Sequence, residues 1–303
     1  MASLPSLRQL RYLIALAEHL NFTRAAEASF VSQSTLSTGL KELESTLGVH
    51  LVERDKQSVA LTVVGEEVVK RARQVLASAE DLSDFASDAS RPMQGQLRLG
   101  VIPTIAPFVL PTLMPAVRQK FPELQLALRE DLTANLLERL RNRQLDFALI
   151  ALPYGTDDLR VLPLYKDKFW LAGREKDPAM NGRAIQLSTE WTERLLLLEE
   201  GHCLRDHALQ ACSATEVANV DGIEATSLLT LVQMVASGMG LALLPEMAVH
   251  SGLLSNLSLK ARPLAAPAPE RVIALVTRST SAHMTEFGAI AQVISSVQRK
   301  KTK

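Results

Sequence analysis

Three short apolar patterns with helical spacing fill the first fifty residues, and each stops abruptly before the next begins. The first extends over residues 7–20, and the second follows Thr23, which we expect to cap its helix. Ser32 is the expected cap of the third helix, and Gly48 is suited to end it. The third pattern repeats at three- and four-residue spacing through Leu36, Leu40, Leu43 and Leu47. Two short helices joined by a tight turn at residues 30–31 predict a helix-turn-helix.

A small hairpin is expected next, followed by a long helix. Residues 49–61 hold two short apolar stretches around a polar turn, which indicates a wing, and Thr62 begins a helix that extends to about residue 87. Apolar residues recur every seven positions, as Leu61, Val68, Val75 and Leu82, with a second series at Ala72, Ala79 and Ala86. This heptad repeat favours a coiled-coil seam with a second copy of the chain. The alternative is a helix packed on its own domain.

The rest of the chain has a different pattern, in which strands and helices alternate after a hinge. Residues 91–96 contain Pro92 and Gly95 and are expected to break the long helix. The alternation that follows predicts two α/β subdomains with a cleft between them. The predicted domains are 1–61 (winged helix-turn-helix), 62–90 (linker helix for dimerisation), 91–96 (hinge) and 97–303 (effector domain).

Composition and charge limit the classes of protein to which this chain can belong. The 33 basic and 33 acidic side chains cancel, which excludes a globally basic nucleic-acid binder but not a local binding face. Two cysteines are too few for a disulfide-stapled secreted scaffold. No apolar stretch is long enough to span a membrane and the first residues do not resemble a signal peptide, so we expect a cytoplasmic protein that does not use a membrane. The sequence shows no metal-ligand cluster and no phosphate loop, so no metal or cofactor is expected.

The second helix of a helix-turn-helix enters the major groove of DNA, so its first turns hold the candidate DNA-reading residues. These residues are Ser32, Gln33, Ser34, Thr35 and Ser37. Their hydroxyl and amide groups can bond base edges or phosphates, and Arg24 and Arg54 are available for contacts with the DNA backbone. Ser32 is also the expected helix cap, so both roles stay open for this residue.

Cys203 is expected at the start of a helix, with His202, Arg205 and Asp206 close to it in sequence. A helix N-terminus and neighbouring cations lower the pKa of a thiol, and the thiolate is the species that attacks peroxide. If the segment between Cys203 and Cys212 is helical, the two residues lie roughly 13–14 Å apart, which is too far for a disulfide unless the helix unwinds. The alternative is a pair of buried, inert cysteines.

Six segments of the N-terminal domain form a motif, which comprises residues 22–27, 31–37, 43–44, 47–54, 61–62 and Gly65. This motif resembles the N-terminal domain of LysR-type transcriptional regulators, and the order of the predicted domains resembles that family along the whole chain. The resemblance implies a winged helix-turn-helix, a linker helix and an effector domain like a periplasmic binding protein. It also implies a homotetramer, a dimer of dimers, that binds promoter DNA and contacts RNA polymerase.

The segment from residue 201 to residue 206, with Cys212 nine positions after Cys203, is similar to the redox segment of the peroxide-sensing members of this family. By this resemblance Cys203 reacts with hydrogen peroxide, Cys212 resolves the product as a disulfide, and His202 and Arg205 activate and position the thiol. Asp206 is expected to orient Arg205 or a histidine. The resemblance also implies a set of peroxide-pocket residues, namely Thr104, Thr133, Thr226 and Arg271. Antioxidant genes would be switched, and glutaredoxin or thioredoxin would reduce the disulfide.

Alternatives to this function remain open on the sequence. The main alternative is a LysR-type regulator that binds a small organic effector between the two subdomains, with incidental cysteines. A thiol peroxidase is a further possibility, but it leaves the DNA-binding part of the chain without a purpose, so an enzyme is not expected. Helix capping is the alternative role for Thr133 and for Thr226.

Overall fold

The computed structural model describes residues 4–54, 59–88, 92–186, 189–211 and 224–301. The chain divides into two compact units, Met1–Ser90 and Arg91–Lys303, which we describe separately. Among the described residues, no helix is both long enough and apolar enough to cross a membrane. Cys212 lies outside the described residues.

The first unit begins with three helices, α1 (Leu7–His19), α2 (Phe22–Ala28) and α3 (Gln33–Leu47). Asn21 caps α2, because its side-chain oxygen accepts hydrogen bonds from the amides of Thr23 and Arg24. The expectation that Thr23 is the cap is therefore wrong: the cap is two residues earlier, at Asn21, and the helix starts at Phe22. The predicted cap of α3 is confirmed, since Ser32 accepts a hydrogen bond from the Thr35 amide at 3.2 Å. Gly48 ends α3 with a left-handed φ of +70°, as expected.

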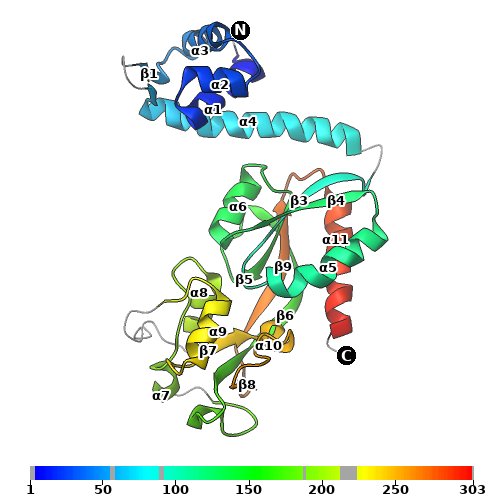
Figure 1. The fold of residues 1–303 in the computed structure, drawn as a ribbon. Coiled ribbons are helices and arrows are strands. Elements are labelled where there is room, and N and C mark those ends of the chain that lie inside the picture. Colours follow the sequence, from blue (N-terminus) through cyan, green and yellow to red (C-terminus); the bar gives the residue numbers. More distant parts are fainter. Residues whose placement is uncertain (1–3, 55–58, 89–91, 187–188, 212–223, 302–303) are drawn as a thin grey trace. The chain divides into compact units, whose positions relative to one another are not determined.

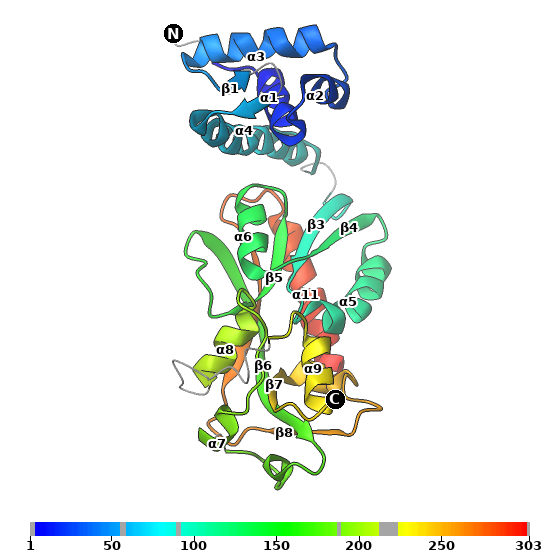
Figure 2. The same ribbon diagram turned by 60° about the vertical axis from the view of Figure 1, so that its left-hand side comes forward.

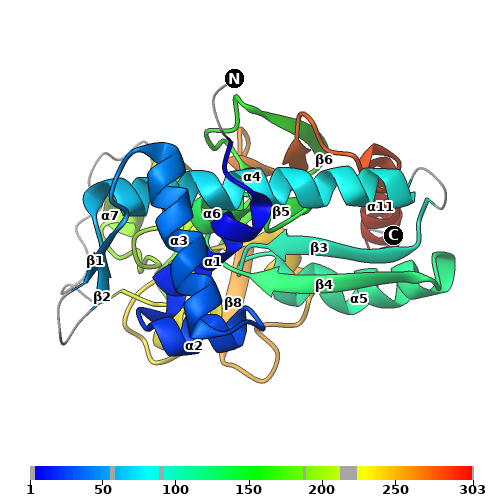
Figure 3. The same ribbon diagram turned by 90° about the horizontal axis from the view of Figure 1, so that it is seen from above.

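A hairpin and a long helix complete the first unit. Strands β1 (Val52–Arg54) and β2 (Val59–Leu61) pair antiparallel, and α4 spans Val63–Asp88. The Thr62 hydroxyl accepts a hydrogen bond from the Gly65 amide at 2.9 Å and donates one to the His50 carbonyl at 2.9 Å, which joins the hairpin to the start of α4. Helix α1 packs against α2, α3 and α4 (Figure 3).

Helix α4 buries one stripe of side chains and exposes another. Val69, Ala72 and Leu76 join the core of the first unit, whereas Val75 is half exposed and Leu82 is 71% exposed. The helix therefore packs partly on its own domain, which was the alternative to the coiled-coil prediction. The seam predicted from the sequence is present only in part, because Ala72 is buried in this core and Leu61 lies in β2. Val75 and Leu82 remain exposed to a second copy, so dimerisation through this helix stays a prediction.

The second unit contains two α/β subdomains, as the strand–helix alternation predicts. The first has a sheet of order β4-β3-β5-β9, made of β3 (Gly95–Val101), β4 (Leu124–Glu130), β5 (Phe147–Leu152) and β9 (Glu270–Arg278). Strand β9 is antiparallel to β5, and the other neighbours are parallel. Helices α5 (Ala106–Lys120) and α11 (Met284–Lys301) cover one face of this sheet, and α6 (Thr133–Arg141) covers the other (Figure 1).

The long strand β6 (Leu159–Arg174) passes from the first subdomain into the second (Figure 2). Its first part pairs with β9, and its last part pairs with β7 (Ala242–Pro245) and β8 (Leu259–Pro263). Among its described residues, the second subdomain has the helices η1 (Pro178–Met180), α7 (Thr189–Thr192), α8 (Cys203–Ala211), α9 (Leu228–Ala236) and α10 (Glu246–His250). Each subdomain has its own apolar core.

Candidate functional site

The predicted DNA-reading residues lie on one exposed edge of the first unit. Gln33, Ser34 and Thr35 are exposed in the first turn of α3, and Ser37 is half-buried. Ser32 caps this turn, and its hydroxyl also contacts the hydroxyls of Ser34 (2.9 Å) and Thr35 (2.7 Å). The capping role predicted for Ser32 is thus present in the structure. Of the two predicted arginines, Arg24 is exposed on α2 and Arg54 lies in β1, where its side chain is outside the description.

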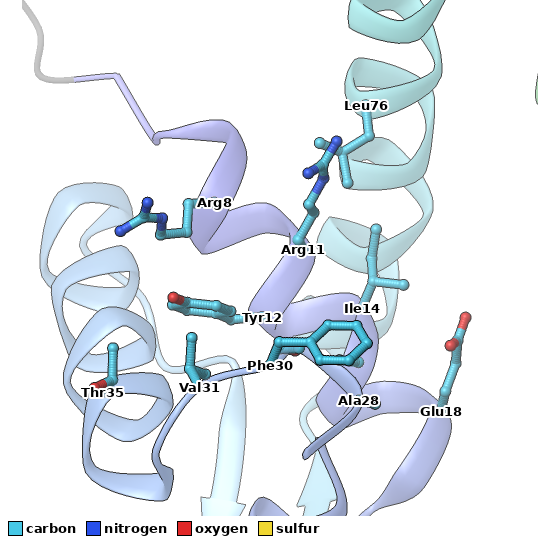
Figure 4. Close-up of a pocket in the computed structure, with 12 residues that line it drawn as sticks. Arg8, Arg11, Tyr12, Ile14, Glu18, Ala28, Phe30, Val31, Thr35 and Leu76 are labelled. Atoms are coloured by element: carbon cyan, nitrogen blue, oxygen red, sulfur yellow. The ribbon is translucent and has the colours of Figure 1, made fainter. Parts of the chain in front are cut away.

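A hollow of about 670 Å³ lies beside this edge, between α1 and the turn before α3 (Figure 4). Arg8 and Arg11 project from α1 next to Tyr12, and Phe30 extends below Arg11 (Figure 4). Phe30 is 96% exposed and has a left-handed φ of +54°, a conformation that phenylalanine rarely adopts. The sequence predicts the turn at this position but gives no sign that its aromatic side chain is exposed.

The second unit brings three separated segments together around a thiol. Cys203 is the first residue of α8 and is only 4% exposed. It lines a narrow pocket with the residues that follow β3 and β4, including Thr104 and Thr133. The pocket is tightly closed, with no room for a water-sized molecule, and Gly201, with a φ of +93°, turns the chain into it. Cys203, Thr104 and Thr133, predicted from the sequence to share a site, therefore lie together at the junction of the two subdomains.

A buried arginine supports this pocket from the side of the sheet. Arg271 on β9 is fully buried; its Nη1 donates to the Thr104 hydroxyl at 2.9 Å and its Nη2 to the Thr104 carbonyl at 3.1 Å. Its Nε donates to Asp167 on β6 at 3.0 Å, and Asp167 is itself only 3% exposed. A buried charge pair of this kind needs hydrogen bonds for its remaining polar groups, and Thr104 supplies them for the guanidinium.

Asp167 is not among the site residues predicted from the sequence. Its neighbours Lys166 and Lys168 suggest a run of solvated charges. Both lysines are indeed exposed, but Asp167 is buried and faces inward with Phe169 and Leu171. The available signal was the two-residue spacing of Asp167, Phe169 and Leu171, which places all three on the same face of a strand.

Burial raises the pKa of the Cys203 thiol, which contradicts the lowered pKa expected from the sequence. The positive charge of Arg271 and the nearby Thr133 hydroxyl act in the opposite direction, and the Asp206 carboxylate adds to the rise. Desolvation is the largest of these effects, because the thiol lies in an apolar setting at the end of the first core. At neutral pH Cys203 is therefore mainly the protonated thiol. The cation that favours its thiolate is Arg271 and not one of its sequence neighbours.

The basic sequence neighbours of Cys203 interact elsewhere. Arg205 donates to the Leu198 carbonyl at 3.0 Å and pairs with Glu224 at 2.7 Å. His202 is buried with its Nε2 3.7 Å from the Glu199 carboxylate. Burial lowers the pKa of His207, so its ring is neutral at pH 7.

Of the remaining predicted pocket residues, Thr133 lines the narrow pocket and Thr226 does not. Thr133 is the first residue of α6 and makes no side-chain cap; its buried hydroxyl has no hydrogen-bond partner among the described residues, and its proximity lowers the pKa of Cys203. Thr226 is exposed and does not line the narrow pocket. Ser227, next to it, caps α9 by accepting a hydrogen bond from the Thr230 amide at 3.1 Å.

Comparisons with known proteins decide the family. Residues 7–66 match the profile described as bacterial regulatory helix-turn-helix protein, lysR family, and residues 90–298 match the LysR substrate binding domain. The chain belongs to the LysR family of transcriptional regulators. LysR-type regulators are not enzymes, so this comparison confirms the expected function class as well as the predicted fold.

Several LysR-type regulators are similar to this chain over nearly its full length. It is 46% identical to the HTH-type transcriptional regulator EstR of Acinetobacter baylyi over 298 residues, which cover 98% of each chain. It is 41% identical to a probable hydrogen peroxide-inducible genes activator of Streptomyces viridosporus, covering 97% of this chain and 95% of that one. Among solved structures, a full-length cysteine-to-aspartate variant of OxyR from Pseudomonas aeruginosa matches with a TM-score of 0.75 and 36% identity, covering 96% of this chain and 98% of that one.

The family assignment gives each unit of this LysR-type regulator a general role. The first unit is a DNA-binding domain, and the second has the fold of the family's substrate-binding domain. The chain is closely related to OxyR over nearly its full length. Within the part of the chain that the structure describes, no group of His, Cys, Asp and Glu side chains could hold a metal ion.

Proposed function

We propose that this LysR-type regulator senses hydrogen peroxide through Cys203 and switches transcription of antioxidant genes. The observation that carries the proposal is the narrow pocket around the thiol. The pocket has no room for a water-sized molecule in this structure, so an organic ligand does not fit, but its polar groups suit peroxide once its walls move slightly apart. The relatives named for peroxide-inducible genes and for OxyR support the same function.

Thr104, Thr133 and Arg271 position and activate the reacting groups in this proposal. The Thr104 oxygen accepts the Arg271 hydrogen bond, so its own O–H is available to donate to a peroxide oxygen. Arg271 and Thr133 stabilise the thiolate against the cost of burial. The thiolate attacks one peroxide oxygen, the O–O bond breaks, and the departing hydroxide takes up the thiol proton as water. Cys203 is oxidised to sulfenic acid and one peroxide molecule is reduced.

Cys212 completes the oxidation. Its thiol sulfur attacks the sulfenic acid sulfur, an S–S bond forms, and the hydroxyl leaves as water with the Cys212 proton. Helix α8 extends from Cys203 to Ala211, which corresponds to an axial rise of about 12 Å. A disulfide needs Cα atoms about 4.4–6.8 Å apart, so forming it unwinds α8. Chemical oxidation thereby becomes a change in the shape of the effector domain.

Residues near the thiol have supporting roles. Arg205 holds the turn into α8 in the reduced state, since its guanidinium binds the Leu198 carbonyl, whereas the Asp206 carboxylate disfavours the Cys203 thiolate. Unwinding α8 would strain this contact. We assign Thr226 no contact with peroxide, because it is exposed in the reduced structure.

The signal passes from the effector domain to DNA through the assembly. We propose a cytoplasmic homotetramer, a dimer of dimers, that contacts RNA polymerase and binds promoter DNA through the first turns of α3. The exposed Gln33, Ser34 and Thr35, with Ser37, read base edges, and Arg24 and Arg54 contact phosphates. Glutaredoxin or thioredoxin returns the disulfide to two thiols.

One observation favours a second function, a regulator that responds to a small organic effector. The buried thiol with a raised pKa fits an inert cysteine, and EstR shares more identity with this chain than the peroxide-linked relative does. This alternative predicts an organic molecule that raises the melting temperature without changing either thiol.

A reporter strain tests the proposed function directly. Replacing Cys203 with serine is expected to abolish the transcriptional response to hydrogen peroxide while promoter binding in vitro is unchanged. Cys212→Ser provides the matched comparison, since it should reach the sulfenic acid without forming the disulfide. A full peroxide response from the Cys203→Ser variant would overturn the proposal.

A further inference from the structure

The second unit contains another cavity, of about 820 Å³, on the far side of Asp167 from the narrow pocket. Strand β6, helix α10 and the ends of α5 and α11 line it, and we call it the α10 cavity. Its volume lies within the range of sites for organic ligands, which is roughly 300–1,000 Å³. The residues that matter for its chemistry are Phe108, Tyr165, Asp167, Glu246 and Met247.

The walls of the α10 cavity combine aromatic rings with negative charge. Phe108 and Tyr165 supply aromatic surface, and burial raises the pKa of Tyr165, so its phenol stays neutral. Glu246 is half-buried and has no ion pair in the described part of the chain. The cationic lining residue Lys166 already pairs with Glu270. The uncompensated charge of the lining is therefore negative, and aromatic faces also attract cations.

We propose that the α10 cavity binds a small organic cation with an aromatic body, and that the bound cation increases the reactivity of Cys203. Glu246 would bind the ammonium group, and the aromatic and apolar wall would hold the ring. This site is separate from the narrow pocket, and no residue lines both.

A continuous set of hydrogen bonds joins the two sites. The Met247 amide on the cavity wall donates to Asp167 Oδ1 at 3.1 Å, and Asp167 Oδ2 accepts from Arg271 at 3.0 Å. Arg271 in turn donates to Thr104, which lines the pocket of Cys203. A cation near Glu246 and Asp167 would draw on the Asp167 carboxylate and leave the charge of Arg271 less compensated. More positive potential at Cys203 favours the thiolate, so the reactivity of the thiol increases.

Calorimetry of the full chain carrying Cys203→Ser tests the binding claim without any thiol chemistry at Cys203. Tryptamine serves as the probe, and indole-3-propionate is the matched compound in which a carboxylate replaces the ammonium. We expect saturable binding of tryptamine, no binding of indole-3-propionate, and a loss of affinity of about tenfold in Glu246→Gln. The exposed Glu123→Gln is the control and should bind as the parent does. Absent binding, equal affinity in Glu246→Gln, or tryptamine acting only by changing the oligomeric state would overturn the claim.

The claim that ligand binding in the α10 cavity changes the reactivity of Cys203 rests on the proposed function only because both concern this thiol. Alkylation of Cys203 by iodoacetamide, followed by peptide mass spectrometry, measures thiol reactivity without peroxide. We expect saturating tryptamine to accelerate alkylation by about threefold at pH 7, with no acceleration in Glu246→Gln. An unchanged rate with tryptamine bound would overturn the coupling, whereas failure of the proposed function would appear as a Cys203 that alkylates but never oxidises.

Discussion

The two units of this regulator build their functional surfaces in opposite ways. In the first unit, the residues expected to read DNA come from one short run, and most are exposed at the start of α3. In the second unit, Thr104, Asp167, Cys203 and Arg271 come from four distant segments and are almost completely buried. A surface made from one helix turn tolerates substitution without loss of the fold. A site made from a buried network carries stability and chemistry in the same residues.

Removing the buried guanidinium is the change with the largest expected effect on this contrast. Arg271→Met leaves Asp167 buried without its partner, which should lower the free energy of unfolding by about 3–5 kcal/mol in a urea titration. Arg24→Met, on the exposed α2, should change that free energy by less than about 0.5 kcal/mol but weaken DNA binding.

A double variant shows whether the unpaired charge is the cause. Asp167→Asn combined with Arg271→Met removes both charges and should recover part of the lost stability. If the Arg271→Met and Arg24→Met variants are equally stable, the buried Asp167–Arg271 pair contributes no more to stability than an exposed arginine of the first unit does.

The pH dependence of Cys203 reactivity tests the second unit at its centre. Because burial raises the pKa above the ordinary value of 9.0, the thiolate fraction and the alkylation rate should rise about tenfold per pH unit between pH 7 and pH 8.5. Thr133→Val removes a hydroxyl that lowers the pKa of Cys203 and should slow the reaction by about threefold at each pH. A rate that levels off below pH 7 would show a lowered pKa and contradict the structure.

The same pKa shift affects folding stability with a defined sign. The folded chain holds the Cys203 proton more tightly than the unfolded chain, so the contribution is present below the ordinary pKa of 9.0. It is lost as the pH rises through the raised pKa of the folded state. Urea titrations of the wild type and Cys203→Ser should therefore diverge with increasing pH in that alkaline range.

Two substitutions in the first turn of α3 have the smallest expected effects and separate capping from DNA reading. Ser32→Ala removes the hydrogen bond to the Thr35 amide and should cost about 1 kcal/mol of stability. Gln33→Ala should leave stability unchanged and reduce discrimination between the promoter and a scrambled fragment by about 1–3 kcal/mol in anisotropy titrations. A stability loss in Gln33→Ala as large as in Ser32→Ala would mean that the exposed surface is also structural.

The sequence could predict most of the first unit because its signals are local. Ser32, Gly48 and the apolar spacing between them lie within a single helix, and the structure has that helix at Gln33–Leu47. The error at Thr23 was also local, since Asn21 is an equally good cap two residues earlier.

The candidate site of the second unit could be predicted only in part, because its geometry depends on long-range contacts. Thr104, Thr133 and Arg271 were identified through the family resemblance, and all three act on Cys203 or its pocket. The direction of the thiol pKa shift was wrong, because the sequence shows the neighbouring cations but not the burial of the thiol or the pairing of Arg205 with Glu224. Asp167 could not be predicted as a site residue because its partner Arg271 lies 104 positions away in the sequence.

Mass spectrometry of the purified chain, with alkylation before and after low-micromolar hydrogen peroxide, tests the central claim most directly. If Cys203 senses peroxide, the intact mass falls by two hydrogens, and a peptide pair linked through Cys203 and Cys212 appears. If both thiols still alkylate fully after peroxide treatment and denaturation, Cys203 is a structural residue and the peroxide-sensing account is contradicted.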